Sequence, residues 1–275
     1  SERISVAHSD NELGRLGGVL NSTFSRLEAA FARQKQFTAD ASHELRTPLS
    51  VIICEAQTAL ARPRTAPEYR ETVETCLDAA QQMRRLIESL LHLARSDAEQ
   101  EQIPRAPLDV ADIARACVER VRPLAGECAL RCDLAPTETF SNADRVGQVI
   151  TNLLTNAIQY NRLDGAVSVR TRPENRSAVI TIADTGPGIA AEDLPHIFER
   201  FYRADKSRSG AHGRSGLGLA ICKAIVEADG GSIEVSSEPG AGTTVTVRLP
   251  RFFGGGVSGA ASTTAAGTRC TARPA

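Results

Sequence analysis

The chain has 275 residues and a formal net charge of −1, with 24% charged residues, 4% aromatic residues and no tryptophan. This near-neutral, aromatic-poor composition gives no reason to expect nucleic acid as a partner. Seven scattered cysteines without a CxxC pair argue against a disulfide framework or a zinc site and fit a reducing cytoplasm. The length predicts about two domains.

Membrane-spanning helices are not expected within this sequence, because no apolar run approaches the roughly 18 residues that such a helix needs. The sequence starts at Ser1 with neither an initiator Met nor a signal peptide. We therefore expect a fragment of a longer protein whose upstream part is missing.

Two long helices are predicted in the first hundred residues. Apolar residues recur at helical spacing over residues 37–60 and again over residues 73–94, and Pro63 and Pro67 interrupt the pattern between them. A lone helical hairpin buries only one seam, so the two stripes favour a dimeric four-helix bundle. The alternative is a hairpin packed on the domain that follows.

Residues 105–250 alternate helices and strands without regular βαβ repetition, which predicts an α/β sandwich. Gly240 and Gly242 are expected to form a turn, and residues 251–275, which contain no acidic residue, a disordered tail. The predicted helices cover residues 111–121, 144–160 and 215–228, and the predicted strands cover residues 166–170, 178–183, 232–236 and 243–249.

His43 is the candidate nucleophile of the first helix. It stands two positions from both Ala41 and Leu45, so it points away from the apolar stripe. An exposed imidazole can react through one ring nitrogen, and the adjacent Glu44 can act as its base or hydrogen-bond partner. Pro48 is expected to loosen or kink the helix beside it.

The whole segment 37–49, FTADASHELRTPL, resembles the phosphoacceptor box of sensor histidine kinases. The resemblance implies that His43 is phosphorylated. It also implies a phosphatase activity toward the partner protein, in which Thr47 positions a water molecule. The alternative for Thr47 is a polar surface residue that merely precedes the proline.

Residues 144–160 carry Asn152 and Asn156, which are four apart and share one helix face. The segment resembles the first box of the ATP-binding domain shared by histidine kinases, Hsp90, gyrase and mismatch-repair ATPases. The resemblance implies that Asn156 coordinates Mg²⁺, that Asn152 supports the phosphates, and that Tyr160 belongs to the same site. Many family members have a phosphate-binding Lys where this chain has Gln159, so the phosphate contacts of this chain are expected to rest more on Arg203.

Asp184, Gly186 and Gly188 form a DTGPG turn directly after a predicted strand. Glycines permit tight turns and the close approach of a ligand. This turn resembles the second box, which implies that Asp184 accepts the adenine amino group.

The segment IFERFYR, residues 197–203, resembles the phenylalanine box, in which Phe198 and Phe201 are expected to anchor a lid. Residues 200–216 carry five basic residues against one acid, Asp205, and a cationic loop can clamp a triphosphate. They are Arg200, Arg203, Lys206, Arg208 and Arg214.

The segment GRSGLGL, residues 213–219, resembles the last box and opens a predicted helix, whose free N–H groups can bind phosphate. Ser215 is placed as a possible helix cap. No P-loop pattern occurs anywhere in the chain. The residues of this box expected to contact the nucleotide are Gly213, Ser215, Gly216, Leu217 and Gly218.

The predicted organisation follows from these resemblances. Residues 1–30 resemble the end of a HAMP domain, residues 31–99 the dimerisation and phosphotransfer hairpin, and residues 105–250 the catalytic domain of the Bergerat (GHKL) type. The fold class is thus α + α/β. The resemblance implies the cytoplasmic portion of an inner-membrane protein, attached to the membrane only through missing upstream helices.

The resemblance also implies the function: ATP and Mg²⁺ are used to phosphorylate His43, and the phosphoryl group passes to an aspartate on a response regulator receiver domain. Two alternatives stay open. An ATPase of the same superfamily would work without the histidine, and a pseudokinase would only act as a scaffold and would not bind nucleotide.

Overall fold

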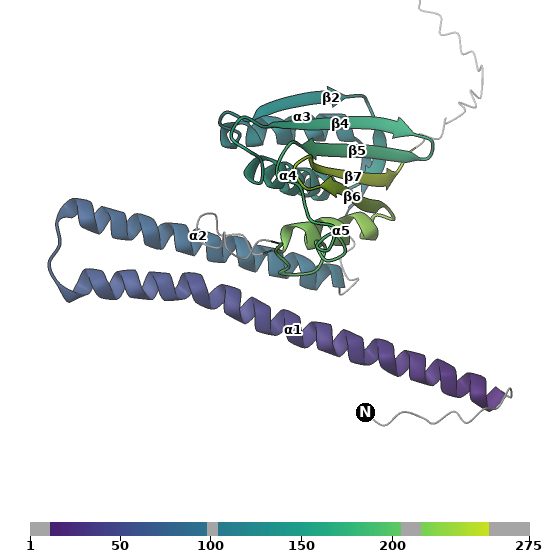
Figure 1. Ribbon diagram of the computed structural model, residues 1–275, viewed down its shortest axis with the longest axis horizontal. Coiled ribbons are helices and arrows are strands. Elements are labelled where there is room, and N and C mark those ends of the chain that lie inside the picture. Colours follow the sequence, from purple (N-terminus) through teal and green to yellow (C-terminus); the bar gives the residue numbers. More distant parts are fainter. Residues whose placement is uncertain (1–11, 98–103, 205–215, 253–275) are drawn as a thin grey trace, which may run out of the picture.

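The computed structural model describes residues 12–97, 104–204 and 216–252, and it consists of a long helical hairpin and an α/β unit (Figure 1). The hairpin pairs α1 (Glu12–Ala61) with α2 (Ala66–Asp97). Within the described ranges, no helix has the length and apolar character to cross a membrane.

The turn between α1 and α2 shows why the first helix ends where it does. Pro63 follows the end of α1, as predicted, but Pro67 lies inside the first turn of α2, where its missing N–H costs no hydrogen bond. Glu68 reaches back to accept hydrogen bonds from the backbone N–H and the hydroxyl of Thr65, both at 2.7 Å. This capping box fixes the start of α2.

Pro48 lies in the interior of α1 and is buried. The helix continues on both sides of it, and Figure 1 shows α1 bent part-way along its length. Proline removes one backbone hydrogen bond and is the usual cause of such a bend.

The α/β unit is built on a five-stranded sheet in the order β2-β4-β5-β7-β6. Only the β2–β4 pairing is parallel, while the other pairings are antiparallel. The strands are β2 (Ala129–Leu134), β4 (Ala166–Glu174), β5 (Ser177–Asp184), β6 (Ser232–Glu238) and β7 (Gly242–Pro250).

Three helices cover one face of this sheet (Figure 1). They are α3 (Val110–Val121), α4 (Ala143–Gln159) and α5 (Gly218–Ala228), and a short 3₁₀ turn, η1 (Arg122–Leu124), follows α3. Their apolar faces and the inward side chains of β4, β5 and β7 form one buried cluster. The predicted α/β sandwich is therefore confirmed.

Three strands were not predicted from the sequence. β1 (Ala106–Asp109) and β3 (Glu138–Ser141) are four residues each and form a two-stranded antiparallel sheet of their own. β2 is an edge strand whose side chains are mostly exposed, so it lacks the apolar alternation of a half-buried strand.

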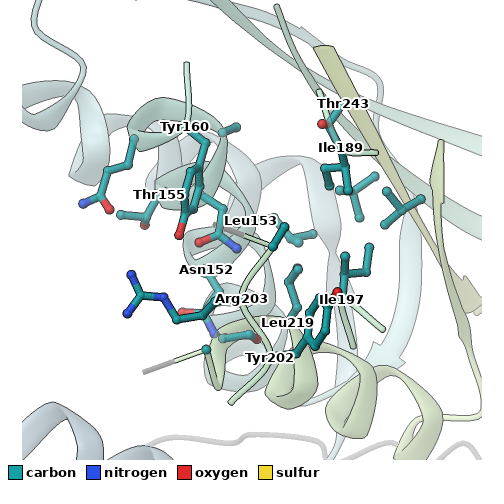
Figure 2. Close-up of a pocket in the computed structure, with 18 of the residues that line it drawn as sticks. Asn152, Leu153, Thr155, Tyr160, Ile189, Ile197, Tyr202, Arg203, Leu219 and Thr243 are labelled. Atoms are coloured by element: carbon teal, nitrogen blue, oxygen red, sulfur yellow. Dashed lines mark hydrogen bonds between the residues drawn. The ribbon is translucent and has the colours of Figure 1, made fainter. Parts of the chain in front are cut away.

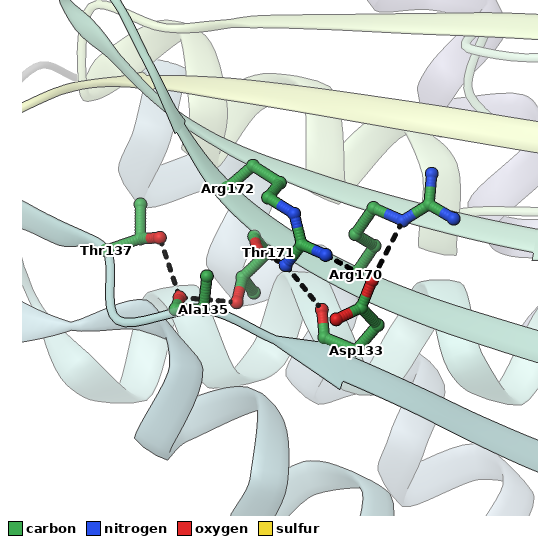
Figure 3. Close-up of polar contacts among 6 residues, drawn as sticks. All are labelled: Asp133, Ala135, Thr137, Arg170, Thr171 and Arg172. Atoms are coloured by element: carbon green, nitrogen blue, oxygen red, sulfur yellow. Dashed lines mark hydrogen bonds and ion pairs between the residues drawn. The ribbon is translucent and has the colours of Figure 1, made fainter.

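Polar contacts hold β2 against β4 instead (Figure 3). Arg172 donates to the Asp133 carboxylate, and the Arg170 Nε lies 3.5 Å from Asp133 Oδ2. Beyond the end of β2, the hydroxyls of Thr137 and Thr171 both donate to the Ala135 carbonyl oxygen at 2.8 Å.

The first two residues of the predicted tail, Arg251 and Phe252, pair with β3. Arg251 forms a β-bridge with Thr139, and the Phe252 N–H donates to the Glu138 carbonyl oxygen at 3.1 Å. The Phe252 ring stacks on Phe140 with 5.8 Å between centroids. Residues 253–275 lie outside the described residues, as do residues 1–11 of the predicted HAMP segment.

The hairpin packs on the α/β unit through α2. Leu86 and Leu93 are buried in the same cluster as Ile221 and Ile225 of α5. The hairpin thus packs on the domain that follows it, which is the alternative to the bundle. This packing covers only part of the hairpin's apolar surface. Large apolar side chains of the hairpin stay exposed in this single chain, among them Leu49, Leu60, Val73, Leu77 and Ile87.

Candidate active site

A cavity of about 920 Å³ lies between α4, the end of β5, the segment after residue 193 and the start of α5 (Figure 2). Helix α2 and Glu44 of α1 close one side of it. It is large enough for a nucleotide-sized ligand.

Asn152 and Asn156 both line this cavity, as expected for two amides on one face of α4. Asn142 caps the start of that helix by accepting hydrogen bonds from the N–H groups of Asp144 and Arg145. The Asn152 amide nitrogen lies 3.5 Å from the Gly218 carbonyl oxygen, so α4 contacts the first turn of α5 at the cavity wall. Tyr160, which caps the end of α4, also lines it.

Asp184 ends β5 and turns its carboxylate to the cavity. The N–H groups of Gly186 and Thr243 donate to Oδ1 at 2.8 and 3.3 Å, while Oδ2 receives no hydrogen bond from any described residue. Burial raises the pKa of Asp184 and the two N–H groups oppose that rise. Oδ2 is therefore placed to accept a hydrogen bond from a bound ligand.

Gly188 needs both its flexible backbone and its lack of a side chain. Its φ is +73°, and a Cβ at this position would lie 2.0 Å from the Glu238 carbonyl oxygen. The turn after Asp184 can therefore pack against the β6–β7 connection only with glycine there. Gly186, by contrast, is absent from the cavity lining and serves by donating its N–H to Asp184.

The phenylalanine box divides into two parts. Phe198 and Phe201, expected to anchor a lid beside the nucleotide, do not line the cavity, whereas Tyr202 and Arg203 do (Figure 2). Phe201 instead packs on Phe37 of α1, with ring centroids 5.9 Å apart. Phe201 thus joins the α/β unit to α1, whereas the centre of the Phe198 ring lies 5.7 Å from Lys223 Nζ of α5.

The last glycine box begins its helix later than predicted. α5 starts at Gly218, and the capping position is Leu217, which is fully buried and provides no side-chain cap. The capping position thus falls two residues later in the chain than predicted. Gly216 and Gly218 line the cavity, while Gly213, Ser215 and the basic residues of the loop 205–215 lie outside the described residues.

His43 is exposed and lies on a different side of α1 from the nucleotide-sized cavity. It borders a second hollow of about 420 Å³ together with Thr47, whose hydroxyl donates to the His43 carbonyl oxygen at 3.3 Å. Glu44, the next residue, faces the large cavity. Partial burial raises the pKa of the Glu44 carboxyl, and the positive charge of Arg203 opposes the rise.

Comparison with known proteins agrees with this geometry. Residues 141–252 match the family of histidine kinase-, DNA gyrase B- and HSP90-like ATPases, and residues 33–99 match the histidine kinase A phosphoacceptor domain. The chain is 35% identical over 243 residues to the sensor protein IrlS of Burkholderia pseudomallei, covering 88% of this chain and 52% of that protein. The chain belongs to the sensor histidine kinases.

A further relative resembles the chain in sequence, and a solved structure resembles it in fold. The sensor histidine kinase YkoH of Bacillus subtilis is 36% identical over 252 residues, covering 90% of this chain and 54% of YkoH. The solved structure of the Acinetobacter baumannii histidine kinase AdeS matches with a TM-score of 0.62 at 24% identity, covering 76% of this chain and 97% of that one. The chain spans about half the length of IrlS and YkoH.

The donor chemistry of the kinase cavity fits Mg²⁺. Within the described ranges no three His, Cys, Asp or Glu side chains group together as a metal site. Mg²⁺, however, keeps most of its ligands as water and phosphate oxygens, so the one amide oxygen of Asn156 on the cavity wall suffices.

Sequence reasoning missed the apolar wall of the cavity. Thr243 directly follows the predicted glycine turn, and its N–H donates to the Asp184 carboxylate. The turn could therefore have indicated that Thr243 lies at the site. The others come from strands, from α4 and from the irregular segment 189–197, and the sequence does not show which of these inward faces meet one another. They are Leu153, Ile182, Ile189, Ile197, Val235 and Val245.

Proposed function

We propose that this chain is the catalytic core of a sensor kinase that uses ATP to phosphorylate its own His43. The observation that carries the proposal is that one chain holds both an exposed histidine on a bundle helix and a nucleotide-sized cavity with Asn156 and Asp184 on its wall. ATP is its substrate.

The proposed reaction assigns a role to each group. Asp184 Oδ2 accepts a hydrogen bond from the adenine amino group, and Asn156 would hold Mg²⁺, which supplies charge neutralisation at the phosphates when bound. A ring nitrogen of His43 attacks the γ-phosphorus, a nitrogen–phosphorus bond forms, and the bond to the bridging oxygen of ADP breaks. Glu44 takes the imidazole proton, and its raised pKa makes it a better base than an ordinary glutamate.

A change of domain arrangement is part of this proposal. His43 does not line the nucleotide-sized cavity, so the α/β unit must move relative to α1 before the phosphorus can reach the imidazole. In-line attack requires the reacting atoms to approach within about 3–3.5 Å.

The partners belong to the proposal as well. The apolar side chains left exposed on the hairpin are suited to a second copy, which would complete a four-helix bundle. The phosphoryl group would pass to a response regulator aspartate, and Thr47 would position the water that later hydrolyses the aspartyl phosphate and releases inorganic phosphate. We also propose that the intact protein is membrane-anchored, with this part in the cytoplasm.

The test is incubation of the full chain with γ-labelled ATP and Mg²⁺. We expect a label that is lost in acid and retained in base, absent from His43→Gln and retained in His196→Gln. His196 is a matched control, because it is also exposed and lies in a different segment, with its Nδ1 2.7 Å from Glu199. Label that persists in His43→Gln contradicts the proposal, and undiminished ATP turnover without label favours a superfamily ATPase.

A further inference from the structure

Helix α2 presents a polar face to the nucleotide-sized cavity. Gln82, Arg85 and Ser89 all line it, and their spacing of three and four residues places them on one side of the helix. Leu86, next to them, is buried against the α/β unit and lines the cavity too. The bundle therefore contributes part of the wall of the nucleotide site.

The face of α2 that carries Arg85 lies across the cavity wall from the start of α5. Helix α2 packs along α5, and Gly218 and Ile221 from the first turn of α5 line the same cavity as Arg85. The N-terminus of α5 carries free N–H groups and the positive end of the helix dipole, which favour phosphate. Arg85 thus stands at the end of the cavity suited to the phosphates.

The charged side chains that line the cavity favour a phosphate-binding role for Arg85. Among the described residues that line the cavity, the cations are Arg85 and Arg203, and Gln159 at the end of α4 is neutral. Glu44 brings a carboxylate to the same wall, which repels a polyphosphate. The charge of Arg203 already acts on Glu44, so Arg85 is the other described cation on the wall that can meet a phosphate.

The side chain of Arg85 is available to bind phosphate. It is exposed, and no ion pair or side-chain hydrogen bond joins it to another described residue. Its neighbour Arg84 does not line the cavity and lies 3.9 Å from Glu88, with 72% of its side chain exposed. Of these two adjacent arginines, Arg85 lines the cavity and Arg84 does not.

We propose that Arg85 binds the phosphate oxygens of the nucleotide, so that a bundle helix completes the ATP site. A guanidinium presents paired donors that match a phosphate, and it keeps its charge at any physiological pH. The inference rests on the proposed function. It adds that bound phosphates stabilise the packing of the α/β unit on α2, more strongly with ATP than with ADP.

Calorimetric titration of the full chain tests this inference, with Mg-ATP and with adenosine as ligands. We expect Arg85→Gln to weaken Mg-ATP binding about tenfold, as removal of a charge-assisted contact does, and to leave adenosine binding unchanged. Arg84→Gln should leave both affinities as in the wild type. Arg85→Lys should retain part of the Mg-ATP affinity, because it keeps the charge and loses the paired donors.

Two outcomes overturn the inference while leaving the kinase proposal intact: Mg-ATP affinity of Arg85→Gln within twofold of the wild type, or an equal loss for adenosine. Failure of the wild-type chain to bind Mg-ATP would instead overturn the proposed function, and the inference with it. Thermal unfolding of each variant separates a folding defect from a lost contact, because Arg85 is exposed and Gln is a good helix former.

Discussion

At the scale of single residues, the environment of Asp184 accounts for its proposed role. Two backbone N–H groups fix one carboxylate oxygen and leave the other toward the cavity. An amide in the same place would keep the shape but could present a donor where the adenine amino group also donates.

We therefore expect Asp184→Asn to weaken ATP binding by about ten- to a hundredfold, because a buried donor is left without an acceptor. The preference for ATP over GTP should fall as well. Competitive binding of the two nucleotides measures both effects. Asp164→Asn, an exposed aspartate in a loop, is the control, and an unchanged nucleotide preference in Asp184→Asn would refute the assigned role.

Cys222 on α5 gives a prediction about pH. Full burial raises the pKa of its thiol to about 12, from an ordinary value of 9.0. Above about pH 9 the unfolded chain therefore binds fewer protons than the native one, so the stability contributed by the neutral thiol is present below that pH and is lost as pH rises toward 12.

The urea midpoint of the wild type should accordingly fall between about pH 8.5 and 10.5, and fall less in Cys222→Ala. The exposed Cys54→Ala serves as the comparison, because its thiol loses no solvent contact on folding. Parallel midpoints for Cys222→Ala and the wild type would contradict the prediction.

At the scale of elements, sequence patterns predicted what local forces determine. The helix break at Pro63 and the alternation of β4 and β5 follow from backbone chemistry and from burial of one face. The edge strand β2 was missed because its contacts to β4 are polar and come from a partner far along the chain. The start of α5 was predicted too early, since Ser215 looks like a cap.

The two glycines that flank the start of α5 give a prediction about this element. Gly216 has φ +68°, and a Cβ there would lie 2.7 Å from the backbone carbon of Phe201, whereas a Cβ at Gly218 would meet nothing within 4 Å. Gly216→Ala should therefore cost at least about 1 kcal/mol of stability, and Gly218→Ala should cost nothing or gain slightly. Thermal unfolding of the two variants measures the difference, and equal midpoints would contradict it.

Pro48 allows a prediction about the bend of α1. A proline in a helix interior costs about 3 kcal/mol relative to alanine, so Pro48→Ala should raise the unfolding temperature. If the bend lets α1 reorient beside His43, the same variant should label more slowly with γ-labelled ATP. Pro63→Ala, in the turn outside either helix, is the control. A Pro48→Ala chain that is more stable and labels as fast as the wild type would show that the bend does not affect His43 phosphorylation.

At the scale of the whole molecule, the candidate site could be predicted only in part. Asn152, Asn156 and Asp184 belong to local motifs, and the structure brings all three to one cavity. The contributions of Glu44 and Arg85 depend on how the hairpin packs against the α/β unit, and no local pattern contains that information. No local pattern predicts the contact between Phe37 and Phe201 either, because the two residues are 164 positions apart in the sequence.

That contact joins α1 to the α/β unit in the arrangement in which His43 lies outside the nucleotide-sized cavity. The Phe37 and Phe201 rings lie 5.9 Å apart, the Arg200 guanidinium lies 5.0 Å from the centre of the Phe37 ring, and Leu45 packs on the same buried cluster. Aromatic pairs and cation–π contacts contribute about 0.5–1.5 kcal/mol each, so together they can shift a two-state equilibrium several-fold.

We expect Phe37→Ala to release this arrangement and to raise the rate of His43 phosphorylation at saturating ATP by up to about tenfold. The KM for ATP should rise in the same variant, because separation from α2 also removes Arg85 from the cavity. Phe31→Ala is the control, since Phe31 lies on the same helix with 68% of its surface exposed. Single-turnover labelling measures the rate and its ATP dependence separately. If the contact opposes the reaction, its removal must raise the rate of His43 phosphorylation. A lower rate with an unchanged KM would therefore mean that the Phe37 contact belongs to the reactive arrangement instead.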